Sequence, residues 1–159
     1  MTLVFNASPL IILAKSGLLD CFLQLAKEVM IPSEVAGEIA CSKDVRDPAR
    51  RWVTHQTRLI QPITTISPFI MAWDLGAGES AVIALTAMHP GAVAVLDDLA
   101  GRRCAQALGL PIIGTLGLVL KAKRTGMIPS ASEALDAITA AGLYISPHHL
   151  ETIRLQAGE

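Results

Sequence analysis

The chain has 159 residues, which fits one domain that buries a core without needing disulfides or structural metals. Hydrophobic residues make up 52 % and charged residues only 17 %, so we expect buried strands and some exposed apolar surface, most simply a contact in a homodimer or higher homo-oligomer. The net charge of −1 excludes a strong global attraction to nucleic acid.

No apolar run reaches the roughly 20 residues that span a bilayer, and the first residues lack the pattern of a secretion signal. Cys21, Cys41 and Cys104 show no metal-ligand spacing and are interpreted as reduced thiols. These features predict a cytoplasmic protein without a membrane segment.

The first half of the chain alternates short apolar runs with helical stretches. The predicted elements are strands at 3–5 and 29–31 and helices at 10–15, 18–27 and 33–41. Ser8 and Ser33 are expected to cap the first and third of these helices. Residues 59–70 are rich in β-branched side chains but are interrupted by Pro62 and Pro68, which predicts an edge strand or an extended loop.

The second half of the chain continues the alternation. The predicted elements are strands at 92–96 and 111–113 and helices at 79–88, 99–108, 115–124, from the capping box at 130–133 to 141, and 147–156. The run at 92–96 is apolar without alternation, as expected of a strand buried on both faces. The fold class is therefore α/β, a three-layer α/β/α arrangement with a central parallel sheet in one domain, 1–159.

Polar side chains follow three of the predicted strands. Asn6 and Ser8 come after the first strand, Asp97 and Asp98 after the apolar strand, and Thr115 after the last strand. Because ligands of open parallel sheets gather beyond the carboxyl ends of the strands, we expect these side chains to lie at one edge.

Two helices can add carboxylates to this edge, Glu38 from the third predicted helix and Glu79 from the start of the fourth. Oxygens of Asp, Glu and Asn are ligands of hard cations such as Mg²⁺ and Mn²⁺, and packed carboxylates repel one another without a cation. Such a cation can activate water and stabilise charge on a phosphodiester. Plainer interpretations exist for each residue: helix capping for the aspartates, the helix dipole for Glu79, and a turn for Asn6.

Five short segments occur in an order and spacing that resemble the PIN-domain superfamily. They are Val4–Ile11, Ile31–Ile39, Leu75–Ser80, Leu96–Asp98 with Arg102-Arg103, and Gly109-Leu110 with Gly114–Gly117. The resemblance is to a prokaryotic branch of unknown function that is related to VapC-type toxin ribonucleases. It covers residues 2 to about 128 and leaves 129–159 as a C-terminal helical extension.

The resemblance implies a parallel sheet flanked by helices, acidic residues that bind Mg²⁺ or Mn²⁺, and hydrolytic cleavage of RNA. By position, the acidic sites of the family fall on Asn6, Glu38, Glu79, and Asp97 or Asp98. Ser8 would support the metal or its water. PIN nucleases usually have aspartate where this chain has Asn6, and the uncharged amide is expected to weaken metal binding and water activation.

Basic and polar residues near these positions are candidates for RNA contacts. Arg102 and Arg103 follow the aspartates by one helical turn, and Thr115 opens the next helix, so we predict that they contact substrate. A solvated charged surface is the alternative interpretation for each arginine. Further basic residues occur in the loop after Glu38 and at the end of helix 115–124.

Three functional hypotheses follow. The first is a metal-dependent endoribonuclease, the toxin of a toxin–antitoxin pair with an antitoxin protein as its partner. The second is a catalytically weak or inactive module that binds RNA or protein, which Asn6 and the low net charge favour. The third is a nucleotide-binding domain that uses Gly114–Gly117 as an anion loop.

Overall fold

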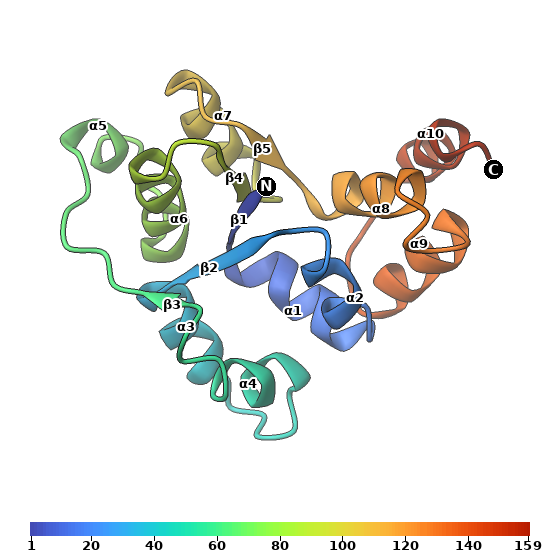
Figure 1. The fold of residues 1–159 in the computed structure, drawn as a ribbon, viewed down its shortest axis with the longest axis horizontal. Helices are drawn as coiled ribbons and strands as arrows, with labels where there is room; N and C mark the ends of the chain where they lie inside the picture. The colour runs from blue at the N-terminus through green and yellow to red at the C-terminus, as the bar shows by residue number, and fades with distance from the viewer.

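The structure is a computed structural model that describes all 159 residues. Five parallel strands form the central sheet in the order β3-β2-β1-β4-β5 (Figure 1). The strands are β1 (Thr2–Phe5), β2 (Glu28–Pro32), β3 (Ile60–Gln61), β4 (Ala92–Val95) and β5 (Ile112–Ile113). The predicted α/β class with a central parallel sheet is therefore confirmed.

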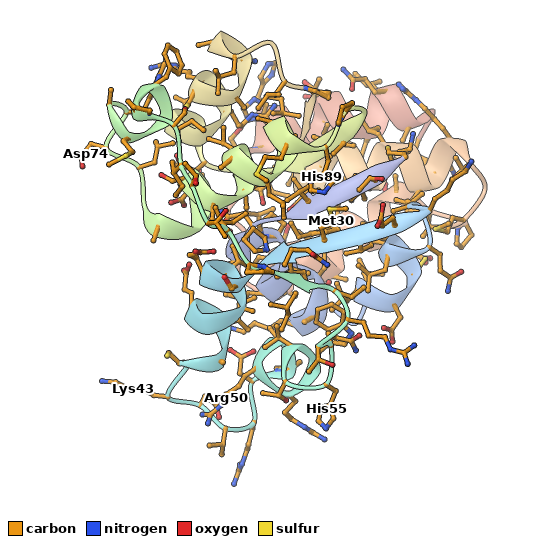
Figure 2. All side chains as sticks on the ribbon, turned by 60° about the vertical axis from the view of Figure 1, so that its left-hand side comes forward. Met30, Lys43, Arg50, His55, Asp74 and His89 are labelled. Carbon is orange, nitrogen blue, oxygen red and sulfur yellow. The ribbon has the colours of Figure 1, made fainter.

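Ten helices connect and cover these strands. They are α1 (Ala7–Lys15), α2 (Leu19–Leu23), α3 (Ser33–Ala40), α4 (Pro48–Val53), α5 (Pro68–Met71), α6 (Ala77–Met88), α7 (Leu99–Ala107), α8 (Thr115–Arg124), α9 (Ala131–Ala140) and α10 (Pro147–Ala157). Helices α1 to α4 lie on one side of the sheet and α6 and α7 on the other (Figure 2). This arrangement is the three-layer fold that the alternating pattern predicted.

The core lies between these layers and includes the middle of the sheet. Leu3, Val4 and Phe5 of β1 are fully buried, and so are Ala94 and Val95 of β4. Both strands therefore carry apolar residues without alternation, as a strand covered on both faces requires. Because these side chains are buried, the register of β1 against β4 is fixed. The register in turn fixes the positions of the residues that follow the two strands.

Two predicted helix caps are wrong. Ser8 lies in the first turn of α1 and is exposed, because the chain enters the helix directly after β1 and Asn6 takes the N-cap position. Pro32 rather than Ser33 takes the N-cap position of α3, and the Ser33 hydroxyl donates a hydrogen bond to Glu34 at 3.1 Å. In both cases the helix begins immediately after the strand, so no separate capping serine is needed.

The segment 59–70 confirms part of its prediction. Two residues, Ile60 and Gln61, pair with the end of β2 as an edge strand, and an extended loop follows. The sequence did not predict α5, which Ser67 caps by accepting a hydrogen bond from the Ile70 N–H at 3.4 Å. The predicted helix 18–27 is also shorter than expected, because only α2 is helical there.

The C-terminal helices pack against one another at the end of the molecule that carries α8 (Figure 1). The Glu159 carboxylate accepts hydrogen bonds from the N–H groups of Ala131 and Ser132 at 2.9 and 2.8 Å and pairs with Lys123 at 2.8 Å. The ammonium group of Lys123 and these N–H groups hold the pKa of Glu159 well below its usual range. Glu159 therefore caps α9 and ties α10 to α8.

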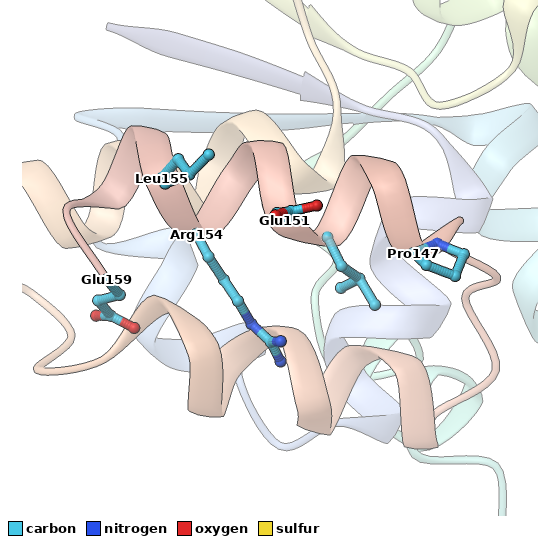
Figure 3. Close-up of a pocket in the computed structure, with 6 residues that line it drawn as sticks. Pro147, Glu151, Arg154, Leu155 and Glu159 are labelled. Atoms are coloured by element: carbon cyan, nitrogen blue, oxygen red, sulfur yellow. The ribbon is translucent and has the colours of Figure 1, made fainter.

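A cavity of about 490 Å³ lies along α10 and is lined by residues such as Pro147, Glu151 and Glu159 (Figure 3). Arg154 crosses from α10 to α9, where it donates a hydrogen bond to Asp136 at 3.2 Å. This cavity contains none of the residues predicted for the metal site.

No helix has the length and apolar character that a membrane crossing requires. All three cysteines are free, and burial raises the pKa of the Cys104 thiol.

Candidate metal centre

The strand order places the carboxyl ends of β1 and β4 side by side at the middle of the sheet. From β1 the chain winds outward to β2 and β3, and it returns to the other side of β1 to form β4 and β5. The carboxyl ends of β1 and β4 are thus the point at which the winding reverses, where open parallel sheets bind ligands. Asn6 follows β1 at this point, and Asp97 and Asp98 follow β4.

Asn6 is buried at this edge, with 4 % of its surface exposed. Its Nδ2 donates a hydrogen bond to Glu79 Oε1 at 3.4 Å. Its Oδ1 is buried and accepts no hydrogen bond. A buried acceptor without a donor costs about 1–3 kcal/mol, so this oxygen is suited to a ligand that accepts its lone pairs.

Glu38 approaches the same space from α3. Gly78, in the first turn of α6, is buried and faces both side chains. A Cβ atom at Gly78 would lie 3.1 Å from Glu38 Oε2 and 3.2 Å from Asn6 Oδ1. The missing side chain therefore leaves room in which an amide oxygen and a carboxylate oxygen from distant segments converge.

Glu79 lies between Asn6 and Asp98. Asp98 is the N-cap residue of α7, and its Oδ2 accepts a hydrogen bond from the Gly101 N–H at 2.9 Å. A Cβ atom at Gly101 would lie 3.5 Å from Glu79 Cγ and 3.8 Å from Asp98 Oδ2. The structure therefore brings Asn6, Glu38, Glu79 and Asp98 to one edge of the sheet.

Asp97, unlike Asp98, is hydrogen-bonded to Thr115. Its two carboxylate oxygens accept hydrogen bonds from Thr115, from the N–H at 2.7 Å and from the hydroxyl at 2.6 Å. Thr115 is fully buried at the start of α8. Asp97 thus caps α8 and links β4 to β5, and the two adjacent aspartates have different surroundings.

The residues predicted to contact substrate differ in their exposure and in their hydrogen bonds. Ser8 is exposed, and its hydroxyl makes no hydrogen bond to the protein. Arg102 is half-buried, and its Nη1 donates a hydrogen bond to the Leu96 carbonyl at 2.9 Å, whereas Arg103 is exposed on α7. The basic loop after Glu38, which carries Lys43, projects away from the sheet (Figure 2).

The residues at this edge form an all-oxygen donor set, which fits a hard cation such as Mg²⁺ or Mn²⁺. No three Asp, Glu, His or Cys side chains lie close enough to one another to hold a metal ion. A cation held by these residues in this arrangement would therefore use the free Oδ1 of Asn6 together with no more than two of the carboxylates of Glu38, Glu79 and Asp98, and with water. Sequence reasoning did not recognise that Gly78 and Gly101 provide the space between these groups, because their contacts are tertiary.

No curated protein and no solved structure matches this chain. A family model described as a PIN domain matches residues 2–159, which includes the helices after residue 128. Because this match spans nearly the whole chain, the protein belongs to the PIN-domain family.

Proposed function

We propose that this protein is an endoribonuclease that hydrolyses phosphodiester bonds of RNA with Mg²⁺ or Mn²⁺ bound at the edge that Asn6, Glu38, Glu79 and Asp98 form. PIN domains are nuclease-like modules that generally depend on divalent metal, and this family membership supports the reaction class. The observation that carries the proposal is the buried Asn6 Oδ1 without a hydrogen-bond donor, beside the carboxylates of Glu38 and Glu79.

The residues of the edge have separate roles in this proposal. The metal would supply positive charge that activates water and stabilises the phosphodiester under attack. Asn6 orients Glu79 through its Nδ2 and directs Oδ1 to the space beside Glu38. Asp98 is anchored at the N-terminus of α7, and its Oδ1 accepts no hydrogen bond from the protein.

Asn6 also explains how the edge is stable without a cation. An aspartate 3.4 Å from Glu79 would place two negative charges in contact, whereas the amide donates a hydrogen bond to the same carboxylate. The amide oxygen carries no charge and therefore binds a cation more weakly than a carboxylate. We accordingly propose a metal site of reduced affinity.

We further propose that this ribonuclease is the toxin of a toxin–antitoxin pair. The chain would then form a homodimer or a complex with an antitoxin. Exposed apolar side chains on α5 and the turn after it support a protein contact: Phe69 is 49 % exposed, Met71 66 % and Trp73 36 %. Analytical ultracentrifugation of the purified chain tests the homodimer, and a Met71→Glu variant that leaves the sedimentation unchanged would argue against this surface.

The nuclease proposal is tested with the full chain, a labelled single-stranded RNA and Mn²⁺. We expect cleavage that EDTA abolishes, and Glu38→Gln is expected to lower the rate by about two orders of magnitude. Glu34→Gln is the matched control, since Glu34 lies on the same helix and its carboxylate accepts a hydrogen bond from Ser33. Cleavage that persists in EDTA, or equal losses in both variants, would contradict the proposal.

A catalytically inactive module that binds RNA or protein is the second candidate. The neutral Asn6 and the absence of three converging Asp, Glu, His or Cys side chains favour it. The two candidates differ in their response to Asn6→Asp. Cleavage that appears or rises in this variant indicates a weakened nuclease, whereas no cleavage and no Mn²⁺ binding by calorimetry indicate a binding module.

A further inference from the structure

A groove of about 470 Å³ lies beside the aspartate pair. It is lined by Asp97 and Arg102, by Ile113 and Leu116 around the turn from β5 to α8, and by His149 from α10. Three segments that are distant in the sequence therefore contribute to one concave surface. His149 is not among the metal ligands proposed above.

Arg102 is a positive charge without an acidic partner in this groove. The three salt bridges of the structure join other residues. The single hydrogen bond of the guanidinium group, from Nη1 to the Leu96 carbonyl at 2.9 Å, fixes its position. Its other N–H groups donate to no protein acceptor, so a half-buried, oriented guanidinium group is left for an anion.

Gly114 keeps the space next to Arg102 open. Its backbone has φ −99° and ψ 175°, an extended conformation that any residue adopts, so the glycine is not needed for the turn. A Cβ atom at Gly114 would lie 3.0 Å from Asp97 Oδ1 and 3.1 Å from Arg102 Nη1. The absent side chain thus provides room between these groups.

His149, on α10, adds a second nitrogen-bearing side chain to the groove. Its Nδ1 lies 3.1 Å from the Ser146 hydroxyl, which leaves Nε2 without a protein partner. The neighbouring His148 is exposed but does not line the groove. Asp97 is the one acidic residue of the lining, and both of its oxygens are already engaged by Thr115.

We infer that this groove binds the phosphodiester that neighbours the scissile one in a single RNA strand, with Arg102 and His149 contacting the phosphate. Ile113 and Leu116 would contact the sugar or base. This inference rests on the proposed function, since Arg102 lies one helical turn after Asp98, with its N–H donating to the Asp98 carbonyl at 3.0 Å. The strand would therefore pass from the acidic edge into the groove.

The test measures binding of a labelled single-stranded oligoribonucleotide to the full chain by fluorescence anisotropy in EDTA, so that neither metal nor cleavage is involved. We expect Arg102→Gln to weaken binding about tenfold and to reduce the salt dependence by about one counterion, and we expect His149→Gln to weaken binding about threefold. The matched controls are Arg58→Gln and His148→Gln, for which we expect changes below about twofold. Arg58 is exposed and precedes β3, at the opposite edge of the sheet from β5.

The outcomes separate this inference from the nuclease proposal. His149→Gln makes the test independent of folding effects at Arg102, because His149 has no partner beyond Ser146. Equal binding by His149→Gln and His148→Gln would overturn the groove assignment. Competition by inorganic phosphate or a mononucleotide as effective as competition by the oligomer would overturn the RNA assignment. If the chain does not cleave RNA with Mn²⁺ but the variants still differ in RNA binding in EDTA, only the nuclease proposal is contradicted.

Discussion

Two glutamates that are distant in the sequence have opposite surroundings. Glu159 accepts hydrogen bonds from two backbone N–H groups and pairs with Lys123 at 2.8 Å. Glu79 accepts one long hydrogen bond, of 3.4 Å, from Asn6 and has no cationic partner. A carboxylate that is surrounded by donors stabilises the fold, whereas one that lies beside an acceptor without a donor is suited to bind a ligand.

The adjacent aspartates repeat this contrast within one loop. Asp97 is held by both donors of the buried Thr115, and Asp98 accepts one hydrogen bond at the start of α7 and is otherwise exposed. Residues of one type, even neighbours, are thus divided between a structural and a candidate functional role by their hydrogen-bond partners. The following predictions test that division.

The largest expected effect is on cleavage by Glu79→Gln. We expect about a hundredfold loss of rate with Mn²⁺, because the variant removes a charge from the metal site, and little change in melting temperature. Glu159→Gln is the reciprocal control and should lower the melting temperature while changing the rate by less than about twofold. Equal rates for the two variants would remove the distinction between these glutamates.

Asp97→Ala is expected to lower the free energy of unfolding by about 2 kcal/mol, since it leaves the hydroxyl and N–H of Thr115 buried without an acceptor. Asp98→Ala removes an exposed helix cap and should cost about 1 kcal/mol. Urea unfolding in EDTA measures both. The order should reverse for Mn²⁺-dependent cleavage, where Asp98→Ala has the larger effect, and the same order in both assays would contradict this assignment.

The sequence predicted the elements that local patterns determine. The apolar runs of β1 and β4 and the start of α8 at Thr115 agree with the structure, because burial on both faces and helix boundaries leave signals within a few residues. The edge position of Asn6, Asp97 and Asp98 followed from the parallel sheet alone.

Tertiary contacts determine the features of the site and the fold that the sequence did not predict. The partner of Asp97 is Thr115, which lies 18 positions later, so the pattern around the aspartates left their roles open. The clearance at Gly78 and the cap that Glu159 provides to α9 also depend on segments that meet only in the fold. Ser8 was misplaced by a local preference that the direct passage from β1 into α1 overrides.

Asn6→Asp tests the unpaired acceptor itself. An added charge should tighten Mn²⁺ binding roughly tenfold, and repulsion from Glu79 should lower the melting temperature of the metal-free protein. Calorimetry and thermal unfolding, each with Mn²⁺ and with EDTA, measure the two effects. Asn6→Ser, which keeps the side chain neutral, is the control. If Asn6→Asp bound Mn²⁺ no better than the wild-type chain, this oxygen would not be a ligand.

The smallest expected effect concerns acid stability at Glu159. Its pKa in the folded chain is depressed below the ordinary value of 4.5, so its stabilisation is fully present above that value and is lost as pH falls. Melting temperatures measured between about pH 6 and pH 3 should therefore decline less for Glu159→Gln than for the wild-type chain. Glu133→Gln is the matched control, because Glu133 is exposed on α9 and accepts no hydrogen bond or ion pair. If the wild-type chain and Glu159→Gln lose stability in parallel, the bonds to Lys123, Ala131 and Ser132 do not hold this carboxylate in its charged form.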